Sequence, residues 1–381
     1  MKISILVPGR LHAFEMAEYL QRFGLLNELV TGYPKKYVIP FGIEKHFIKS
    51  LYINEIINRT TNWLGLGYPL DFLACEAFDY LASKLIKFNS DVYFIWSGYG
   101  LKTIRVIRKK NSKAKIIIVR GSAHIEEHEE LLKKINKSQK PQINLKIIDK
   151  ELKEYDACDY ITVPSTYAYN SFIRKNFPSE KIFKNNLGVD LTSFPYQKKK
   201  VQSKKIVFGY TGTLSKQKNV ASIIQAINKL NLISENFSLI LAGPIDYTSF
   251  DKNMLNHDFI TYYGKLPQPE LYKIYQKTDV FILNSVQDGF AMVLLQAMSC
   301  GCPIISTQNT GGPDVVTDYN NGIIIPAMDN DALEKALIWF YDNKDKIPEM
   351  GEQSRNISER GFTWDDFGKR NVEFVSKISN H

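Results

Sequence analysis

The sequence predicts an α/β protein built from two doubly wound parallel sheets. Its 381 residues are too many for one small core and suit two domains of ordinary size. Short apolar runs alternate with helical stretches, which is the pattern of βαβ units. The alternation stops at a lysine-rich segment near residue 200 and then begins again. We therefore expect two Rossmann-like domains that face each other across a cleft, where a ligand would bind.

The first half contains runs rich in β-branched and aromatic residues, at 2–8, 91–97, 115–120 and 160–165. Near-continuous apolar runs of this length predict strands of a parallel sheet that is covered on both faces. We assign residues 1–197 to this first domain. The aromatic-rich stretch 41–80 is less regular, and it either packs inside the domain or forms an acceptor-facing or membrane-facing surface.

The second half repeats the pattern, with strands expected at 205–212, 237–243, 279–285 and 303–308. A helix is expected at 219–230, between the first two of these strands. We assign 205–362 to the second domain. The lysine-rich segment 196–205 joins the two domains, and its charge predicts a solvated linker.

Lysine and arginine total 49 against 40 aspartate and glutamate, which gives a formal net charge of +9. This excess favours anionic partners such as nucleotides, phosphorylated substrates or an anionic membrane surface, and we expect no nucleic-acid partner. The four cysteines are too few and too scattered for a disulfide framework. The first ten residues do not form a signal peptide, and no run of about 18 apolar residues exists. We expect a cytoplasmic protein that can bind the inner face of the membrane peripherally.

The segment 280–301 predicts a strand, a loop and a helix in succession. Asp288 and Gly289 lie in the loop, at the carboxyl end of the strand, where ligands of open α/β sheets bind. Gln296 follows one or two helical turns later, within reach of ligand hydroxyls. The backbone N–H groups that open the helix would attract phosphate or sugar oxygens: Phe290, Ala291 and Met292. The alternative for Asp288 is a simple helix N-cap.

The segment 207–227 has the same order of strand, glycine-containing loop and helix. Gly212 lets the backbone approach a ligand, and Lys216 and Lys218 lie beside the turn. Asn219 is one of the few residues other than glycine that tolerates a positive φ. A lysine in such a loop is a point charge for a diphosphate, although an ordinary exposed lysine is the alternative for either one.

These two segments resemble glycosyltransferase family 4, whose members have the GT-B fold. The family pattern E-G-F-x-x-x-x-x-E-A-M-A-x-G-x-P-V-I is similar to "DGFAMVLLQAMSCGCPII" at 288–305. The pattern G-R-L-x-x-x-K-G is similar to "GTLSKQKN" at 212–219. The resemblance continues through 163–173, 185–194 and 310–326. The segment 362–370 resembles the start of the family's terminal helix, which implies that residues 363–381 cross back to the first domain.

The resemblance implies roles for single residues. Asp288 stands where the family has a glutamate that contacts donor-sugar hydroxyls, and Gln296 stands where a second glutamate binds the ribose. Lys218 keeps the role of neutralising the diphosphate as it leaves. Thr213 replaces the family arginine and offers only a hydroxyl, so Lys216 is the candidate for the missing charge.

The first domain matches the family less closely. Gly9 and Arg10 follow a strand and precede a helix, in the segment that in the family faces the donor phosphates. His124 lies in a strand-then-histidine loop that resembles the family loop directed at the donor sugar, and a purely structural histidine is the alternative. The run 124–128 also fits the zinc-peptidase pattern H-x-x-E-H, which a doubly wound domain does not favour. We expect no metal site.

We therefore expect a retaining hexosyltransferase that uses a UDP- or GDP-sugar, without metal or other cofactor. The acceptor is expected to be a saccharide or a lipid-linked glycan of a bacterial surface polymer, and the candidate catalytic residues are His124, Lys218 and Asp288. One alternative is a nucleotide-sugar-binding protein weakened in catalysis by Thr213 and Gln296. Another is a GT-B-fold epimerase, for which we identify no acid and base carboxylates.

Overall fold

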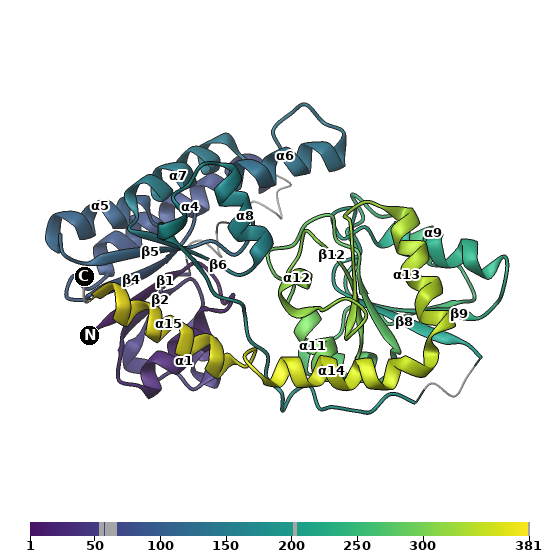
Figure 1. Cartoon of the computed structure of the whole chain (residues 1–381). Helices are drawn as coiled ribbons and strands as arrows, with labels where there is room; N and C mark the ends of the chain where they lie inside the picture. The colour runs from purple at the N-terminus through teal and green to yellow at the C-terminus, as the bar shows by residue number, and fades with distance from the viewer. Residues whose placement is uncertain (53–56, 58–66, 201–203, 380–381) are drawn as a thin grey trace. The chain divides into compact units, whose positions relative to one another are not determined.

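The computed structural model describes residues 1–52, 57, 67–200 and 204–379. By their contacts the residues form two compact units. The N-terminal unit comprises Met1–Pro164, Tyr169–Asn185 and Trp364–His381, and the C-terminal unit comprises Ser165–Ala168 and Asn186–Thr363. Each unit contains one parallel sheet with helices packed against it (Figure 1).

The N-terminal unit has, in its described residues, a parallel sheet in the order β3-β2-β1-β4-β5-β6-β7. The strands are β1 (Ile3–Val7), β2 (Leu26–Thr31), β3 (Ile48–Ser50), β4 (Val92–Trp96), β5 (Lys115–Val119), β6 (Tyr160–Val163) and β7 (Ile182–Lys184). The four predicted strands are confirmed as β1, β4, β5 and β6. Three strands of this sheet were not predicted: β2, whose six residues include Asn27 and Glu28, and the three-residue edge strands β3 and β7, which are too short for a periodic signal.

Two groups of helices cover this sheet. Figure 1 shows α1 (Ala13–Arg22) and α15 (Trp364–Ser379) together on one face, and α4 (Gly67–Leu85), α5 (Leu101–Lys110) and α7 (Leu145–Ala157) together on the other. The unit also contains α6 (Ile125–Asn136), most of α8 (Thr166–Arg174) and the short helices α2 (Lys35–Val38), η1 (Ile39–Phe41), η2 (Lys45–Phe47) and η3 (Ser179–Lys181).

The stretch 41–80 had two predicted locations. Residues 53–56 and 58–66 of it lie outside the described residues. Within α4, the side chains of Ala74, Cys75 and Phe78 are almost completely buried. This part of the stretch therefore packs inside the unit, because burial of its apolar face against the sheet stabilises the helix.

The C-terminal unit has, in its described residues, a parallel sheet in the order β10-β9-β8-β11-β12-β13. The strands are β8 (Ile206–Thr211), β9 (Phe237–Ala242), β10 (Ile260–Tyr262), β11 (Val280–Leu283), β12 (Ile304–Thr307) and β13 (Gly322–Ile325). The four predicted strands are confirmed as β8, β9, β11 and β12. The predicted helix 219–230 is confirmed as α9 (Val220–Asn231).

The other helices of this unit are α10 (Leu271–Lys277), α11 (Val293–Ser299), α12 (Gly312–Val315), α13 (Asn330–Asp342) and α14 (Ile347–Glu359), with the 3₁₀ turns η4 (Lys252–Leu255), η5 (Gln268–Glu270) and η6 (Lys344–Lys346). In Figure 1, α9 lies beside α13 and α11 lies beside α14. The prediction of doubly wound α/β architecture is confirmed.

Each sheet has a point where the strand order reverses. In the C-terminal unit β8 lies between β9 and β11, and in the N-terminal unit β1 lies between β2 and β4. At such a point, the loops that follow two neighbouring strands leave in opposite directions and open a crevice at the carboxyl edge of the sheet. The topology thus indicates where a ligand would bind: at the loops after β8 and β11 in one unit, and at the loops after β1 and β4 in the other.

The sequence predicted that the lysine-rich segment 196–205 is a solvated linker, but one of its lysines is buried. The side chain of Lys199 is only 5% exposed, and its ammonium donates a hydrogen bond of 2.6 Å to the carbonyl of Tyr275. That carbonyl lies in the last turn of α10, where unpaired carbonyl groups and the helix dipole attract a cation. This contact fixes one point of the segment on the C-terminal unit.

No helix in the described parts of the chain is long and apolar enough to cross a membrane.

Gly368 provides a test of how α15 packs on α1. A Cβ atom added to this residue would lie 2.1 Å from Cγ of Tyr19, within the ring's own volume. We expect Gly368→Ala to lower the free energy of unfolding by about 1–3 kcal/mol, the usual cost of overpacking. Helix propensity alone would stabilise the variant by ~1 kcal/mol, so the two effects have opposite signs. Urea denaturation measures the change, and Lys369→Ala on the exposed side of the same helix is the control. A stabilised Gly368→Ala variant would contradict the close packing.

Candidate active site

An ion pair joins the two loops at the carboxyl edge of the C-terminal sheet. Lys218 lies in the loop after β8 and Asp288 in the loop after β11, and the Lys218 ammonium contacts the Asp288 carboxylate. Their side chains are 24% and 20% exposed, so the pair is in contact with solvent. Because β8 and β11 flank the reversal of strand order, the structure brings these two sequence-predicted residues together at the ligand-binding edge.

Two glutamines hold these loops together, and the sequence analysis had not singled them out. The Gln217 amide donates to Oε1 of Gln287 at 3.1 Å, and the Gln217 carbonyl accepts from the Val286 N–H at 2.9 Å. Gln287 is 1% exposed. Neither residue stands out in the sequence, because an isolated glutamine has no local pattern. Their bonds set the separation at which Lys218 and Asp288 meet.

Gly212 and Asn219 both have a positive φ, which the sequence had indicated for Asn219. Gly212 has a φ of +142°, and a Cβ atom there would lie 2.8 Å from the Tyr210 hydroxyl. A Cβ atom on Gly243 would in turn lie 1.8 Å from the Gly212 carbonyl oxygen, so the two glycine backbones are packed together. Asn219 has a φ of +52° and begins α9 in the left-handed region.

Thr213 and Lys216 are both exposed in the same loop. The Thr213 carbonyl accepts a hydrogen bond of 2.9 Å from the Tyr210 hydroxyl, and the Lys216 N–H donates to Ser249 Oγ at 3.2 Å. The backbone at both residues is therefore fixed. Their side chains face solvent beside Lys218.

The predicted start of the helix after Asp288 was wrong. The helix α11 begins at Val293, with Met292 as its N-cap, and Ala291 has a left-handed φ of +63°. The amides of residues 290–292 therefore lie in a turn before the helix. The alternative that Asp288 is the N-cap is also wrong, because its N–H donates to the carbonyl of Asn309 at 2.9 Å and its carboxylate contacts Lys218.

The turn that follows Asp288 is held by polar contacts that sequence reasoning missed. The hydroxyl of Ser165 donates to the carbonyl of Gly289. Next to it, the carboxylate of Asp314 accepts hydrogen bonds of 2.8 and 2.7 Å from the N–H and the hydroxyl of Thr166. Phe290 is almost fully buried, and its carbonyl accepts from the Gly311 N–H at 3.1 Å. These partners are more than 20 residues away in sequence, so no local pattern could reveal them.

Gln296 lies in the core, although the sequence predicted a side chain that stays outside it. It is 5% exposed, and its Oε1 accepts a hydrogen bond of 3.0 Å from the Tyr275 hydroxyl. The same hydroxyl lies 2.8 Å from Thr211 Oγ1. Burial raises the pKa of Tyr275, which therefore remains a neutral donor. A neutral amide is easier to bury here than a carboxylate would be.

His124 lies at the carboxyl edge of the other sheet, in the loop after β5. It is the N-cap of α6, and its Nδ1 accepts from the Glu126 N–H at 3.3 Å. Burial and the nearby positive charges of Arg120 and Lys175 lower the pKa of His124 to about 4. The imidazole is thus neutral near pH 7. With Nδ1 as an acceptor, its proton is on Nε2, which can donate a hydrogen bond.

Gly9 and Arg10 lie between β1 and α1, at the order reversal of the N-terminal sheet. The Gly9 carbonyl accepts a bond of 3.3 Å from the Thr31 hydroxyl. Arg10 pairs with Glu15 at 2.8 Å, and its guanidinium lies 4.3 Å from the ring centroid of Phe41. These contacts stabilise the loop and hold the guanidinium beside α1.

An acidic side chain from α7 holds the neighbouring loop after β4. The Glu154 carboxylate accepts from the N–H groups of Gly98, at 2.5 Å, and Gly100, at 2.7 Å. Burial raises the pKa of Glu154 to about 8. Beside it, Glu151 contacts the Arg120 guanidinium at 3.2 Å. Buried acids on α7 thus position two loops of this edge. The sequence did not indicate this burial, because acidic residues on a helix are usually exposed.

The H-x-x-E-H run does not form a ligand set. Glu127, the middle acid of the pattern, is paired with the guanidinium of Arg174 at 2.6 Å. Among the residues that the structure describes, no group of three or more His, Cys, Asp or Glu side chains could hold a metal ion. His124 is the N-cap of α6 and His128 lies in its first turn, and burial lowers the pKa of each imidazole to about 4.

Comparison with known proteins shows which sequences this chain resembles. Residues 194–361 match the family described as glycosyl transferases group 1. The chain is 29% identical over 328 residues to an uncharacterized glycosyltransferase of Methanocaldococcus jannaschii, covering 82% of this chain and 80% of that protein. It is 24% identical to O-antigen chain mannosyltransferase B of Escherichia coli, covering 59% of this chain and 63% of that one.

The fold resembles that of solved glycosyltransferases along its whole length. Sucrose-phosphate synthase of Thermosynechococcus elongatus superposes with a TM-score of 0.72 at 15% identity, over 99% of both chains. HepE of Anabaena, solved in complex with UDP-glucose, gives a TM-score of 0.67 at 13% identity over 99% of this chain and 100% of that chain. The chain has the GT-B fold, and its sequence is similar to those of glycosyltransferases. Membership of family 4 is consistent with these matches.

The depressed pKa of His124 predicts a loss of stability in acid. The unfolded chain takes up a proton near pH 6.5, whereas the folded imidazole takes it up only near pH 4, so stability falls as pH drops through this window. We expect His124→Asn, which keeps an N-cap oxygen, to reduce this fall. Urea denaturation at pH 7 and pH 4 measures it, with exposed His46→Asn as the control. Equal pH dependence in wild type and His124→Asn would contradict the burial argument.

The hydroxyl of Tyr275 is predicted to stabilise the C-terminal unit through its two partners. Tyr275→Phe leaves the buried Gln296 Oε1 without this donor, and should lower the free energy of unfolding by about 1–3 kcal/mol. Tyr247→Phe, at a side chain 73% exposed, is the matched control and should change it little. Urea denaturation of both variants tests this, and equal stability would show that the hydroxyl network carries no net energy.

Proposed function

We propose that this glycosyltransferase is a retaining family 4 enzyme that moves a hexose from a UDP- or GDP-sugar to a saccharide or lipid-linked acceptor. The observation that carries the proposal is the partly exposed Lys218–Asp288 ion pair at the point where the strand order reverses. Such a crevice binds nucleotides in doubly wound folds. The names of relatives support the glycan pathway: O-antigen chain mannosyltransferase B, and a putative colanic acid biosynthesis glycosyltransferase of Salmonella typhimurium.

The ion pair would separate when the donor binds. The Lys218 ammonium would turn to the diphosphate, and Asp288 would accept hydrogen bonds from sugar hydroxyls. Both side chains reach solvent already, so the exchange of partners needs no unfolding. Structures of HepE with UDP and of starch synthase IV of Arabidopsis thaliana with ADP support a nucleotide diphosphate as the leaving group.

Catalysis would depend mainly on stabilising that leaving group. Lys218 would neutralise charge as it develops on the diphosphate, with Lys216 and the Thr213 hydroxyl beside it in the same loop. Arg10 and the Gly9 backbone are the corresponding candidates in the N-terminal unit. His124 would donate a hydrogen bond from its Nε2–H group to a hydroxyl of the donor sugar, because its imidazole is neutral. No protein nucleophile is assigned, and neither metal nor other cofactor is required in this scheme.

The turn at Asp288–Met292 and the amide of Gln296 would complete the donor site. The contacts of Gly289 and Phe290 fix the turn, so that its backbone is ordered before the donor arrives. The bond from Tyr275 to Gln296 Oε1 orients the amide, whose NH₂ group would donate to the ribose.

A second function, donor binding without turnover, is favoured by two observations. Gln296 is buried and bonded within the protein, and Thr213 carries no charge near the diphosphate. A protein with this site would bind a nucleotide sugar and release it unchanged. Incubation with a panel of UDP- and GDP-sugars, followed by detection of free sugar or glycosylated lipid extract, distinguishes the two. Tight donor binding without transfer to water or to any acceptor would support the second function.

The assignment of Lys218 predicts a selective loss of diphosphate binding. Lys218→Met keeps the apolar stem and removes the charge, so it should weaken UDP or GDP binding about tenfold or more and leave uridine or guanosine binding nearly unchanged. Calorimetric titration measures both, and Lys335→Met, exposed on α13, is the control. Equal losses for nucleotide and nucleoside would remove Lys218 from the phosphate role.

A further inference from the structure

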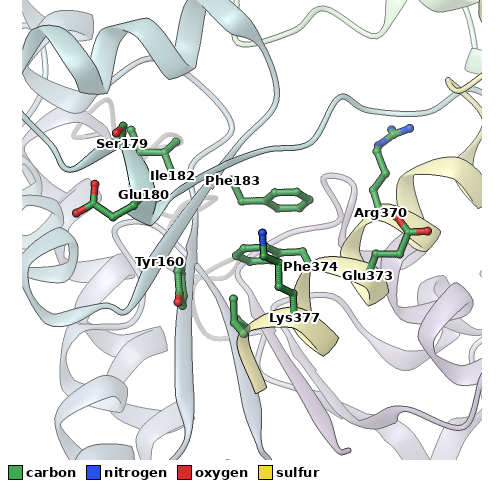
Figure 2. Close-up of a pocket in the computed structure, with 10 residues that line it drawn as sticks. Tyr160, Ser179, Glu180, Ile182, Phe183, Arg370, Glu373, Phe374 and Lys377 are labelled. Carbon is green, nitrogen blue, oxygen red and sulfur yellow. The ribbon is translucent and has the colours of Figure 1, made fainter. Parts of the chain in front are cut away.

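A cavity opens on the N-terminal unit between the segment η3–β7 and the helix α15. Its volume is about 510 Å³, within the range of small-molecule sites. Figure 2 shows Glu180 and Phe183 on one side of it and Arg370, Phe374 and Lys377 of α15 on the other. All its lining residues belong to the N-terminal unit, so the cavity is complete within that unit.

Aromatic rings form the apolar part of the cavity. The rings of Phe183 and Phe374 are stacked, with centroids 4.1 Å apart and planes inclined by only 4°. Tyr160 meets Phe374 edge to face at 5.4 Å. All three side chains are half-buried and line the cavity. Aromatic faces of this kind attract the slightly positive C–H groups of a ligand.

The charged lining residues balance each other. Arg370 and Lys377 contribute two positive charges, and Glu180 and Glu373 contribute two negative charges. Asn185 Oδ1 accepts from Arg370 Nε at 2.7 Å and fixes the direction of the guanidinium. An anion in the cavity would meet two carboxylates and a cation would meet two positive groups. The balance favours a neutral ligand that has many hydrogen-bond donors and acceptors.

The cavity lies away from the candidate active site. Tyr160 is the first residue of β6 and Ile182 is the first residue of β7, so the cavity is at the amino ends of these strands. The loops of His124, Gly9 and Arg10 follow the carboxyl ends of their strands, at the opposite edge of the same sheet. A ligand here would leave the catalytic loops unoccupied.

We propose that this cavity is a second saccharide site, which binds a neutral pyranose of a glycan chain. The C–H groups of the sugar lie against the outer side of the stacked Phe183–Phe374 pair, because the inner faces of the two rings cover each other, and its hydroxyls bond the carboxylates and cations of the rim. The inference deepens the proposed function and rests on its saccharide acceptor, since a glycan held here has a raised effective concentration for transfer. A sugar ring fits the combination of apolar faces, balanced charge and both kinds of hydrogen-bonding group.

Saturation-transfer NMR on the full chain tests the site, with maltotetraose, mannotetraose and lactose as probes and excess UDP present. We expect at least one sugar to bind, and Lys377→Ala and Glu180→Ala to weaken it roughly fivefold each, the effect of losing one hydrogen bond. Lys109→Ala, exposed on α5 and outside the cavity lining, is the matched control and should bind as wild type does.

Three results would overturn the second site: no probe binds, UDP displaces the sugar, or both cavity variants bind as wild type does. Binding of phosphatidylglycerol vesicles that Lys377→Ala abolishes, without sugar binding, would also overturn it and indicate a lipid headgroup instead. Lys218→Met should retain the sugar signal. Failure of the wild type to bind both UDP and GDP would count against the proposed function alone, so the two failures are distinguishable.

Discussion

Burial of both faces of each parallel sheet is the constraint on which this structure depends. Every residue of β1, β4, β11 and β12 is buried, so these strands offer no place for exposed chemistry. The polar side chains that these four strands carry, such as Ser4 and Ser306, are buried, so exposed polar side chains come from the loops at the strand ends. The reversal of strand order then decides which loops lie side by side, and it brings Lys218 to Asp288.

Two ion pairs at the carboxyl edges of the sheets differ in exposure, and this difference indicates which of them is structural and which can bind a ligand. Glu151 and Arg120 are almost completely buried, and removing either partner would leave a charge without compensation. Lys218 and Asp288 are partly hydrated, and each can exchange its partner for a ligand at low cost. The more exposed pair is therefore the one suited to binding, while the buried pairs hold the loops in place.

The amide at position 296 is explained by its surroundings in the core. Thr211 at the end of β8, Tyr275 in α10 and Gln296 in α11 form a chain of hydrogen bonds beneath the loops of the candidate site. A neutral side chain can complete such a chain without the desolvation cost of a buried charge. The departure from the family acid thus has a structural role whatever its effect on catalysis. It also links the strand beneath Lys218 to the helix that follows Asp288.

The sequence by itself determined the α/β class, the eight strands β1, β4, β5, β6, β8, β9, β11 and β12, and the helix α9, because an apolar run and its periodicity are local properties. It also located Lys218, Asp288, Gly212 and Asn219, since strand, loop and helix follow each other within about twenty residues. Tertiary structure alone decided the late start of α11, the burial of Gln296 and Lys199, and the contacts of Gln217 and Ser165. Those features arise from partners distant in the chain, and a sequence read locally carries no record of which atoms will be buried together.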